Sequence, residues 1–269
     1  MIGTGKPVGE HIRAWRQRRR MSQLDLALEA EISTRHLSFL ETGRAQPSRE
    51  MVLRLADQLE IPLRERNVIL VAAGFAPVFP ERPLADPGLA QARRAVEVIL
   101  KGHEPYPALA VDLRWNLVAA NAAVAPLLEG VAPELLAEPV NVVRLALHPR
   151  GLASRTANLA EWRAHLIERL RRQLDLTADD GLAALLEEVR GYPPAPASDR
   201  RGEDLGLVAT PYQLMAGERL LSFWSTTTVF GSAVDITLSE LTLETFFPAD
   251  SATAEALALA QAHAARTSA

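Results

Sequence analysis

The stretch SQLDLALEAEISTRHLSFLETGR, residues 22–44, decides the first half of the fold. Ser22 is a favourable helix N-cap, and Asp25 three residues later nearly completes a capping box. Ser33 is a second N-cap candidate further along the same stretch. Gly43 is the residue type that ends a helix by taking the left-handed conformation. The stretch therefore predicts two short helices joined by a tight turn.

The second of these helices keeps polar groups on the face that packing does not use. Apolar side chains can pack the two helices together: Leu26, Ala27, Ala30, Leu37 and Leu40. Hydrogen-bonding groups and one aromatic ring remain outside: Thr34, Arg35, His36, Ser38 and Phe39. Such an edge suits the major groove of DNA, where the bases present donors and acceptors. The residues predict a DNA-binding helix-turn-helix, and the alternative is an ordinary helical hairpin.

The same segment resembles the helix-turn-helix of the xenobiotic-response-element family and of lambdoid phage repressors. The matching positions are Ser22-Gln23, Ala27, Ile32-Ser33 and Leu40-Glu41-x-Gly43-Arg44. The resemblance implies that Gln23 contacts the DNA backbone and that Thr34 and Arg35 face bases. The candidate DNA-binding residues are Arg18, Arg19, Gln23, Ser33, Thr34, Arg35, His36, Ser38, Phe39 and Arg44. One position departs from the family pattern, because Ala30 or Glu31 stands where a turn glycine is common.

Charge is distributed unevenly along the chain, although the net charge is only -4. Residues 1–70 carry 12 Lys and Arg against 9 Asp and Glu, whereas the remaining residues carry 17 against 24. A basic head on an acidic body indicates that nucleic acid contacts only the head. Four arginines just before the motif are candidates for phosphate contact, the alternative being a solvated helix face: Arg16, Arg18, Arg19 and Arg20.

Composition excludes several classes of protein. The 269-residue chain has no Cys, so it has no disulfide, thiolate metal site or cysteine nucleophile. Its 48% hydrophobic content is sufficient for buried cores, and its length suits two domains. The N-terminus has no signal-peptide core, and no run of about 18 apolar residues occurs, so we expect a cytoplasmic protein without a membrane span.

A proline-rich stretch divides the chain into two domains. We assign residues 1–75 to an all-α, five-helix helix-turn-helix domain, and residues 76–104 to a linker that contains a helix. Residues 105–269 then form the second domain, which ends in an Ala-rich helix from Ser251. Trp15 is expected to pack in the core of the first domain.

The second domain alternates between strand-like and helical patterns. Strands are expected on either side of a turn at 112–114, and again over 206–214, 219–230 and 240–247. Helices are expected after Asn121, after Asn141, over about 156–175 and after Thr177, with a polar loop at 192–204. This order predicts an α+β domain with an antiparallel sheet, similar to a PAS domain.

Both halves together resemble the MmyB-like transcription regulators over roughly residues 8–255. The blocks that carry this resemblance are RHLSFLETGRAQPSREMVLRLADQLEIPLRERNVILVAAGFAP at 35–77, YPALAVDLRWNLVAANAA at 106–123, NVVRLALHPRGL at 141–152 and DITLSELTLETFFPAD at 235–250. The resemblance implies a DNA-binding regulator whose PAS-like domain binds a small apolar or amphiphilic molecule. Fatty acids are the ligand class that it suggests.

Bulky side chains near the expected sheet are candidates for the walls of an apolar pocket. A carboxylate head group would need a cation or several hydroxyls, and Arg144 is the first choice for it. The candidate ligand-binding residues are Trp115, Leu117, Arg144, Trp162, Phe223, Trp224, Thr226 and Phe246. Each aromatic ring has the alternative of simply filling a core.

Motifs for catalysis or metal binding are missing from the sequence, because the six His lack metal-ligand spacing and no nucleophile is paired with a base. We therefore expect a non-enzymatic regulator without a cofactor, apart from a bound fatty acid. It should bind double-stranded DNA as a homodimer, because operator half-sites lie about 34 Å apart. Two alternatives remain: a second domain that only dimerises or binds a protein partner, and one that acts on a small substrate.

Overall fold

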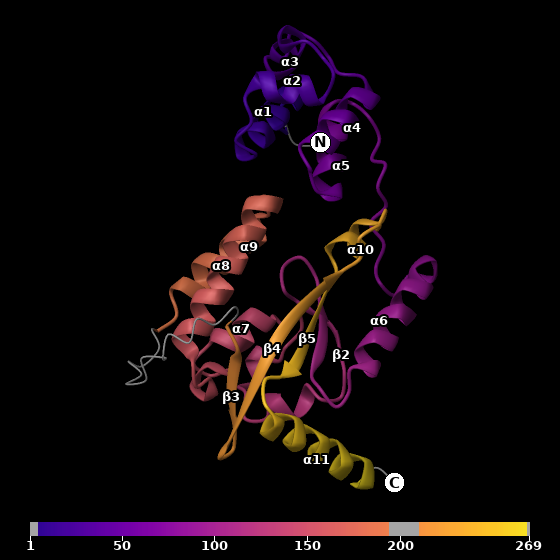
Figure 1. The fold of residues 1–269 in the computed structure, drawn as a ribbon. Helices are drawn as coiled ribbons and strands as arrows, with labels where there is room; N and C mark the ends of the chain where they lie inside the picture. The colour runs from indigo at the N-terminus through magenta and orange to yellow at the C-terminus, as the bar shows by residue number, and fades with distance from the viewer. Residues whose placement is uncertain (1–4, 194–209, 268–269) are drawn as a thin grey trace. The chain divides into compact units, whose positions relative to one another are not determined.

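A computed structural model describes residues 5–193 and 210–267 of the chain. The chain divides into two compact units (Figure 1). The first unit comprises residues 1–82 together with the short segments 175–178 and 233–239, and the second unit comprises the rest. Each unit has its own cluster of buried apolar side chains.

The first unit is all-α, as the sequence predicts. Over its described residues up to 82, five α-helices form: α1 (Val8–Arg18), α2 (Gln23–Glu29), α3 (Thr34–Glu41), α4 (Arg49–Gln58) and α5 (Leu63–Ala72). Trp15 of α1, Leu26 of α2 and Leu37 of α3 are buried together in its core. Trp15 therefore packs inside the unit, as expected.

Local hydrogen bonds explain where α2 and α3 begin. The Asp25 backbone N–H donates to Ser22 Oγ at 3.1 Å, and the Ser22 N–H donates to the Asp25 carboxylate at 2.8 Å, so the capping box is complete. The His36 N–H donates to Ser33 Oγ at 3.1 Å. Between the helices, Glu31 takes the left-handed conformation with φ +54°, and this conformation is unfavourable for a residue with a side chain.

A close approach of backbones joins α1 to α3. A Cβ atom added at Gly9 would lie 2.3 Å from the Leu40 carbonyl oxygen and 2.8 Å from the Glu41 carbonyl oxygen. Only glycine fits at that distance, so Gly9 sets how closely α1 packs on the C-terminal end of α3. Gly43, with φ +72°, then ends the helix-turn-helix, as the sequence predicts.

The second unit is built on one antiparallel sheet within its described residues. Its strands are β1 (Ala108–Val111), β2 (Leu117–Ala120), β3 (Tyr212–Ala216), β4 (Arg219–Val229) and β5 (Thr242–Pro248), in the order β2-β1-β5-β4-β3. Every neighbouring pair is antiparallel. The α+β class and the antiparallel sheet are therefore confirmed. The expected strand at 206–214 falls partly outside the described residues, and the loop at 192–204 falls almost entirely outside them.

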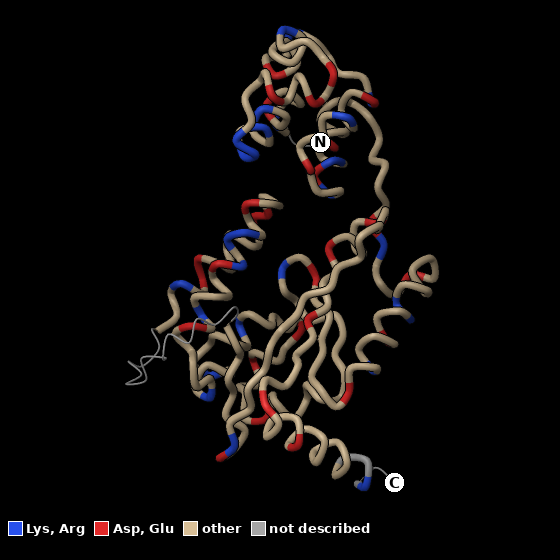
Figure 2. The backbone as a smooth tube through the Cα atoms, viewed as in Figure 1, with Lys and Arg blue, Asp and Glu red and all other residues tan. Residues whose placement is uncertain are grey.

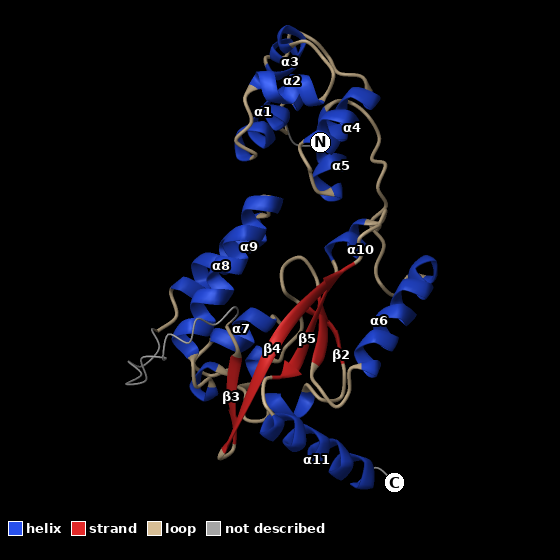
Figure 3. Cartoon of the chain, in the orientation of Figure 1, coloured by secondary structure: helices blue, strands red, loops and turns tan. Residues whose placement is uncertain are grey.

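Helices lie on both faces of this sheet (Figure 3). The α-helices are α6 (Ala90–Gly102), α7 (Val142–Leu147), α8 (Leu159–Thr177), α9 (Asp180–Arg190) and α11 (Ser251–Thr267). A further helix, α10 (Ile236–Glu240), lies between β4 and β5 in the chain and belongs almost entirely to the first unit. Four short 3-10 helices connect them: η1 (Pro87–Leu89), η2 (Ala125–Leu128), η3 (Pro133–Leu135) and η4 (Ala153–Arg155). Leu109 packs on the cluster that contains α7, α8 and α9, whereas its neighbours Ala108 and Ala110 pack with Val96 and Leu100 of α6. The period of two in β1 thus separates the two layers.

Two of the expected helix caps in this unit are wrong. Asn121 does not cap a helix; its side chain accepts a hydrogen bond from the Ala108 N–H and donates to the carbonyls of Leu100 and Tyr106. Asp179 rather than Thr177 caps α9, by accepting the Leu182 N–H at 2.8 Å. Asn141 does cap α7, as expected, through the Arg144 N–H at 3.1 Å.

Candidate functional site

The first candidate site is the outer face of α3. Arg35, Ser33 and Arg44 are exposed, while Thr34, His36, Ser38 and Phe39 are half-buried. The Arg35 guanidinium lies 5.3 Å from the centre of the Phe39 ring, and that of Arg44 lies 5.9 Å from it. Two guanidinium groups, those of Arg35 and Arg44, therefore make cation–π contacts with the Phe39 ring beside the recognition face. This arrangement keeps the predicted base-reading and phosphate-binding groups together on one surface.

A buried ion pair supports this face from behind. Both guanidinium nitrogens Nε and Nη2 of Arg16 donate to the Glu41 carboxylate, at 2.6 and 2.9 Å, and the Glu41 side chain is only 2% exposed. The amide of Gln23 donates to the same carboxylate at 2.8 Å. Glu41 thus connects α1, the start of α2 and the end of α3. The hydrogen bonds that Arg16 donates to Glu41 raise the pKa of the Arg16 guanidinium.

The arginines that precede the motif have different surroundings in the structure. Arg16 is buried in the ion pair and cannot reach phosphate, so the sequence interpretation of Arg16 is wrong. Arg19 donates to the carbonyls of Leu59 at 2.8 Å and of Glu60 at 3.0 Å, and thereby caps the C-terminal end of α4. Arg18 and Arg20 are exposed. Arg18 therefore remains a candidate for phosphate contact, and Arg19 has a structural role.

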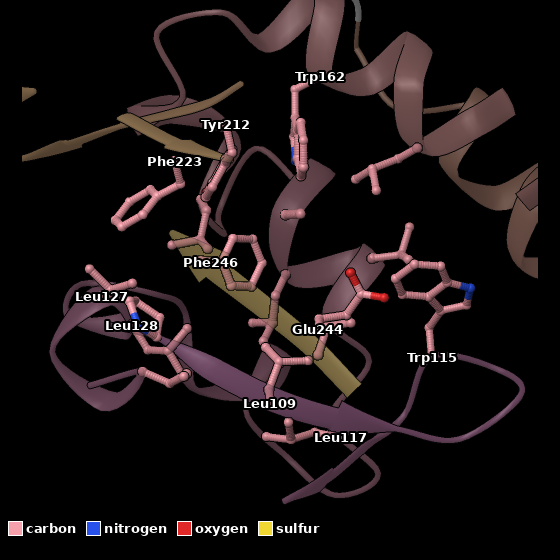
Figure 4. Close-up of a pocket in the computed structure, with 18 of the residues that line it drawn as sticks. Leu109, Trp115, Leu117, Leu127, Leu128, Trp162, Tyr212, Phe223, Glu244 and Phe246 are labelled. Atoms are coloured by element: carbon pink, nitrogen blue, oxygen red, sulfur yellow. The ribbon is translucent and has the colours of Figure 1, made fainter. Parts of the chain in front are cut away.

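The second candidate site is an apolar cavity of about 100 Å³ inside the second unit. Figure 4 shows Trp162, Tyr212 and Phe223 on one side of it and Leu109, Leu117 and Leu127 on the other. The walls come from all five strands, from the helices α7 and α8, and from η2. A concave apolar site of this kind is typical of small-molecule binding.

One ion pair interrupts the apolar lining. Arg169 of α8 donates to the Glu244 carboxylate of β5 through Nη1 at 2.9 Å and through Nη2 over a shorter contact. Arg169 also donates to Thr227 Oγ1 at 2.7 Å and lies 4.6 Å from the centre of the Trp115 ring. Glu244 is buried, so its charge depends on this guanidinium. The cavity therefore contains no net charge from this pair.

Five of the predicted ligand-binding residues line the cavity: Trp115, Leu117, Trp162, Phe223 and Phe246. Three do not. Arg144 is paired with Glu188 at 2.8 Å, Thr226 bonds to Thr245 at 2.6 Å, and Trp224 follows Phe223 on the opposite face of β4. The sequence analysis missed Arg169 and Glu244. Each carried a signal, because Arg169 continues the buried stripe of α8 and Glu244 alternates with Phe246 along β5.

Trp115 carries backbone strain at this site. Its φ is +65°, a region that costs a bulky residue about 1–3 kcal/mol. Its indole N–H donates to Gln173 Oε1 at 2.8 Å, and only 5% of the residue is exposed. The hairpin between β1 and β2 thus holds a large ring against the cavity at a conformational cost, which is typical of positions that serve a site.

Charged residues follow the helices of this unit, and the strands are mostly uncharged (Figure 2). Among the residues that the structure describes, no group of three or more His, Cys, Asp or Glu side chains could hold a metal ion. Within the same residues, none of the helices has the length and apolar character needed to cross a membrane.

Two family models match the chain, one in its first part and one in its second part. A family model described as the MmyB-like transcription regulator ligand binding domain matches residues 92–260, which is more than half of the chain. A model described as Helix-turn-helix matches residues 12–66. No curated protein matches the chain.

Proposed function

The chain belongs to the MmyB-like transcription regulators, and on that premise we propose that it is a homodimeric, fatty-acid-responsive regulator of transcription. The DNA-binding part is the helix-turn-helix, and the ligand-binding part is the α+β unit. We interpret the α+β unit as PAS-like and the protein as cytoplasmic and non-enzymatic. The observation that carries the proposal is the apolar cavity within the matched ligand-binding domain.

The proposed DNA contacts follow from the exposure of each side chain. Thr34, Arg35 and His36 begin α3, and the start of a recognition helix is the part that reaches base edges. Gln23, Ser33 and the exposed Arg44 would then contact the backbone, since polar and cationic groups around the helix fix its position on the duplex. Arg35 is our first candidate for a bidentate contact to guanine.

The proposed ligand is a single-chain amphiphile with a short to medium acyl chain. The cavity of about 100 Å³ is smaller than an engineered apolar cavity of about 150 Å³ that binds benzene. Any acyl chain longer than a few carbons, octanoic acid included, would therefore need the walls to move apart. Fatty acids fit the apolar lining, and a ligand of this kind would act by binding one arrangement of the dimer better than another.

Mass spectrometry of the purified, gently unfolded protein tests this function. We expect a co-purified fatty acid in stoichiometric amount, and we expect its removal to change the affinity for an operator selected from random duplexes. Protein that carries no lipid, and whose operator affinity does not respond to added fatty acids, would exclude the ligand-responsive function. In that case a domain that only dimerises or binds a protein partner becomes the better account.

A further inference from the structure

A second, larger pocket lies next to the apolar cavity. Its volume is about 480 Å³, and η2, the β3–β4 hairpin and α11 contribute its walls. Leu127 of η2 lines both the inner cavity and this outer pocket. Leu127 is thus shared by an apolar cavity and a larger pocket whose lining includes several charged side chains.

Arg155 lines the outer pocket beside that leucine. Its Nη2 donates to the Leu127 carbonyl, and the residue is half-buried at the end of η4. Within the described part of the chain, no carboxylate pairs with Arg155, whereas Arg144 is paired with Glu188 and Arg169 with Glu244. A partly buried guanidinium without an acid is a site for an external anion, because charge-assisted hydrogen bonds would compensate for its burial.

Tyr212 lines the inner cavity, and its hydroxyl is a second polar group near Arg155 in the fold. The residue is 6% exposed, and its hydroxyl is among the buried polar atoms that lack a hydrogen-bond partner in the described residues. Burial raises its pKa to about 12, while the nearby Thr156 hydroxyl and, to a smaller extent, the charge of Arg155 act in the opposite direction. Thr156, which follows Arg155, forms an antiparallel bridge with Leu214 of β3, and the Ala157 N–H donates to the Gln213 carbonyl at 2.9 Å. Arg155 and Tyr212 therefore come from two paired segments, one lining the outer pocket and the other the inner cavity.

We propose that Arg155 and the Tyr212 hydroxyl bind the carboxylate of an acyl acid at the boundary marked by Leu127. The acyl tail then occupies the inner cavity, and the outer pocket is the route of entry. This assignment rests on the proposed fatty-acid function and names its head-group site. It replaces Arg144, whose guanidinium Glu188 already occupies.

Other charged groups around the outer pocket are Arg219, Glu104 and Glu129. Arg219 and Glu129 are exposed, and Glu104 accepts a hydrogen bond from the Ala122 N–H at 3.3 Å. No ion pair joins either acid to Arg155 in the described residues. The acids therefore leave Arg155 available, and Arg219 adds a second positive charge near the entry.

The experiment compares octanoic acid with 1-octanol, which has the same chain length and no carboxylate. Calorimetry on the full-length protein, first freed of lipid, should show the acid binding at least about tenfold more tightly than the alcohol. Arg155→Gln should remove that preference and leave the binding of octanol unchanged. Arg144→Gln is the matched control and should keep the preference, because Arg144 lies outside both pockets.

Two further measurements test the head-group site in protein whose folding is checked or is wild-type. Tyr212→Phe should weaken the acid severalfold without lowering the thermal unfolding midpoint, since it removes a buried hydroxyl that has no partner. In the wild type, the preference for the acid should fall as the pH drops through the pKa of octanoic acid, because the neutral acid loses its charge-assisted bond.

The outcomes distinguish a failure of the head-group site from a failure of the proposed ligand-responsive function. An equal loss of acid binding in Arg144→Gln, or full acid binding in Arg155→Gln, overturns the head-group site and leaves the ligand-responsive function intact. A wild-type protein that binds neither octanoic acid, octanol nor longer fatty acids overturns both.

Discussion

At the scale of single residues, function depends on a few side chains that are held in costly positions. Trp115 and Glu31 both take the left-handed region, and Glu41 is a buried carboxylate. Such positions are stable only because their surroundings determine them. They are also the positions at which substitutions have the most predictable effects.

Glu31→Gly should stabilise the DNA-binding unit. A residue with a Cβ pays about 1–2 kcal/mol in the left-handed conformation, and the extra freedom of an unfolded glycine offsets about 0.5–1 kcal/mol of that gain. We expect a net increase in unfolding free energy of up to about 1 kcal/mol. Chemical denaturation measures it, and a clear loss of stability would show that the Glu31 side chain contributes in another way.

Glu41→Ala should destabilise the same unit strongly. Removing one partner of a buried ion pair costs about 3–5 kcal/mol, because Arg16 would stay buried without its acid. Gln23 would also lose the carboxylate that holds its amide. A decrease in the unfolding free energy below about 1 kcal/mol, measured by denaturation, would mean that Arg16 finds another partner.

Arg35→Ala should reduce sequence discrimination more than general DNA affinity. A bidentate contact to guanine is worth about 1–3 kcal/mol of discrimination. Arg44→Gln is the comparison, since a phosphate contact should weaken all sequences alike and reduce the salt slope by about 1. Binding to matched and mutated operators over a range of salt concentrations separates the two. The assignment fails if Arg35→Ala weakens both operators equally.

At the scale of elements, local sequence rules predicted most helices and strands and failed at several junctions. Ser22, Ser33 and Asn141 have the capping roles that the sequence indicates. Asn121 carries the same signal but bonds across to β1 and α6, because tertiary partners compete with a local cap. Asp179 could replace Thr177 because two capping residues stand close together in the sequence.

Asn121→Ala tests how much this junction contributes. The change leaves the Ala108 N–H and the Leu100 carbonyl without the amide that satisfies them, and a buried unsatisfied group costs about 1–3 kcal/mol. We expect the second unit to lose at least about 2 kcal/mol of unfolding free energy. Asn141→Ala is the control, with an expected loss of about 1 kcal/mol for a helix cap. Equal effects of the two variants would contradict the bridging role.

The candidate site was predictable only in part, for a physical reason. The period of two in β4 places Phe223 and Trp224 on opposite faces, but it does not say which of them faces the cavity; the structure places Phe223 there. Periodicity could not identify the residue that binds the ligand's carboxylate, because this depends on which arginine has no carboxylate partner within the protein. That question is decided by contacts between distant segments, such as Arg144 with Glu188 and Arg169 with Glu244.

At the scale of the whole molecule, we expect the ligand to change the affinity for DNA by shifting the populations of two arrangements of the protein. A ligand changes operator affinity only to the extent that it binds the two arrangements differently. A change of about tenfold in operator affinity corresponds to a coupling free energy of about 1.4 kcal/mol, which lies in the usual range for allosteric proteins. A ligand that binds both arrangements equally would not regulate.

The most direct test is the operator affinity of lipid-free protein, measured by fluorescence anisotropy with and without saturating octanoic acid. We predict a change of at least about fivefold in the wild type, in either direction, and a clearly smaller change in Arg155→Gln at a concentration of acid that just saturates the wild type. The same operator affinity with and without acid, in a wild-type protein shown by calorimetry to be saturated, would contradict the account.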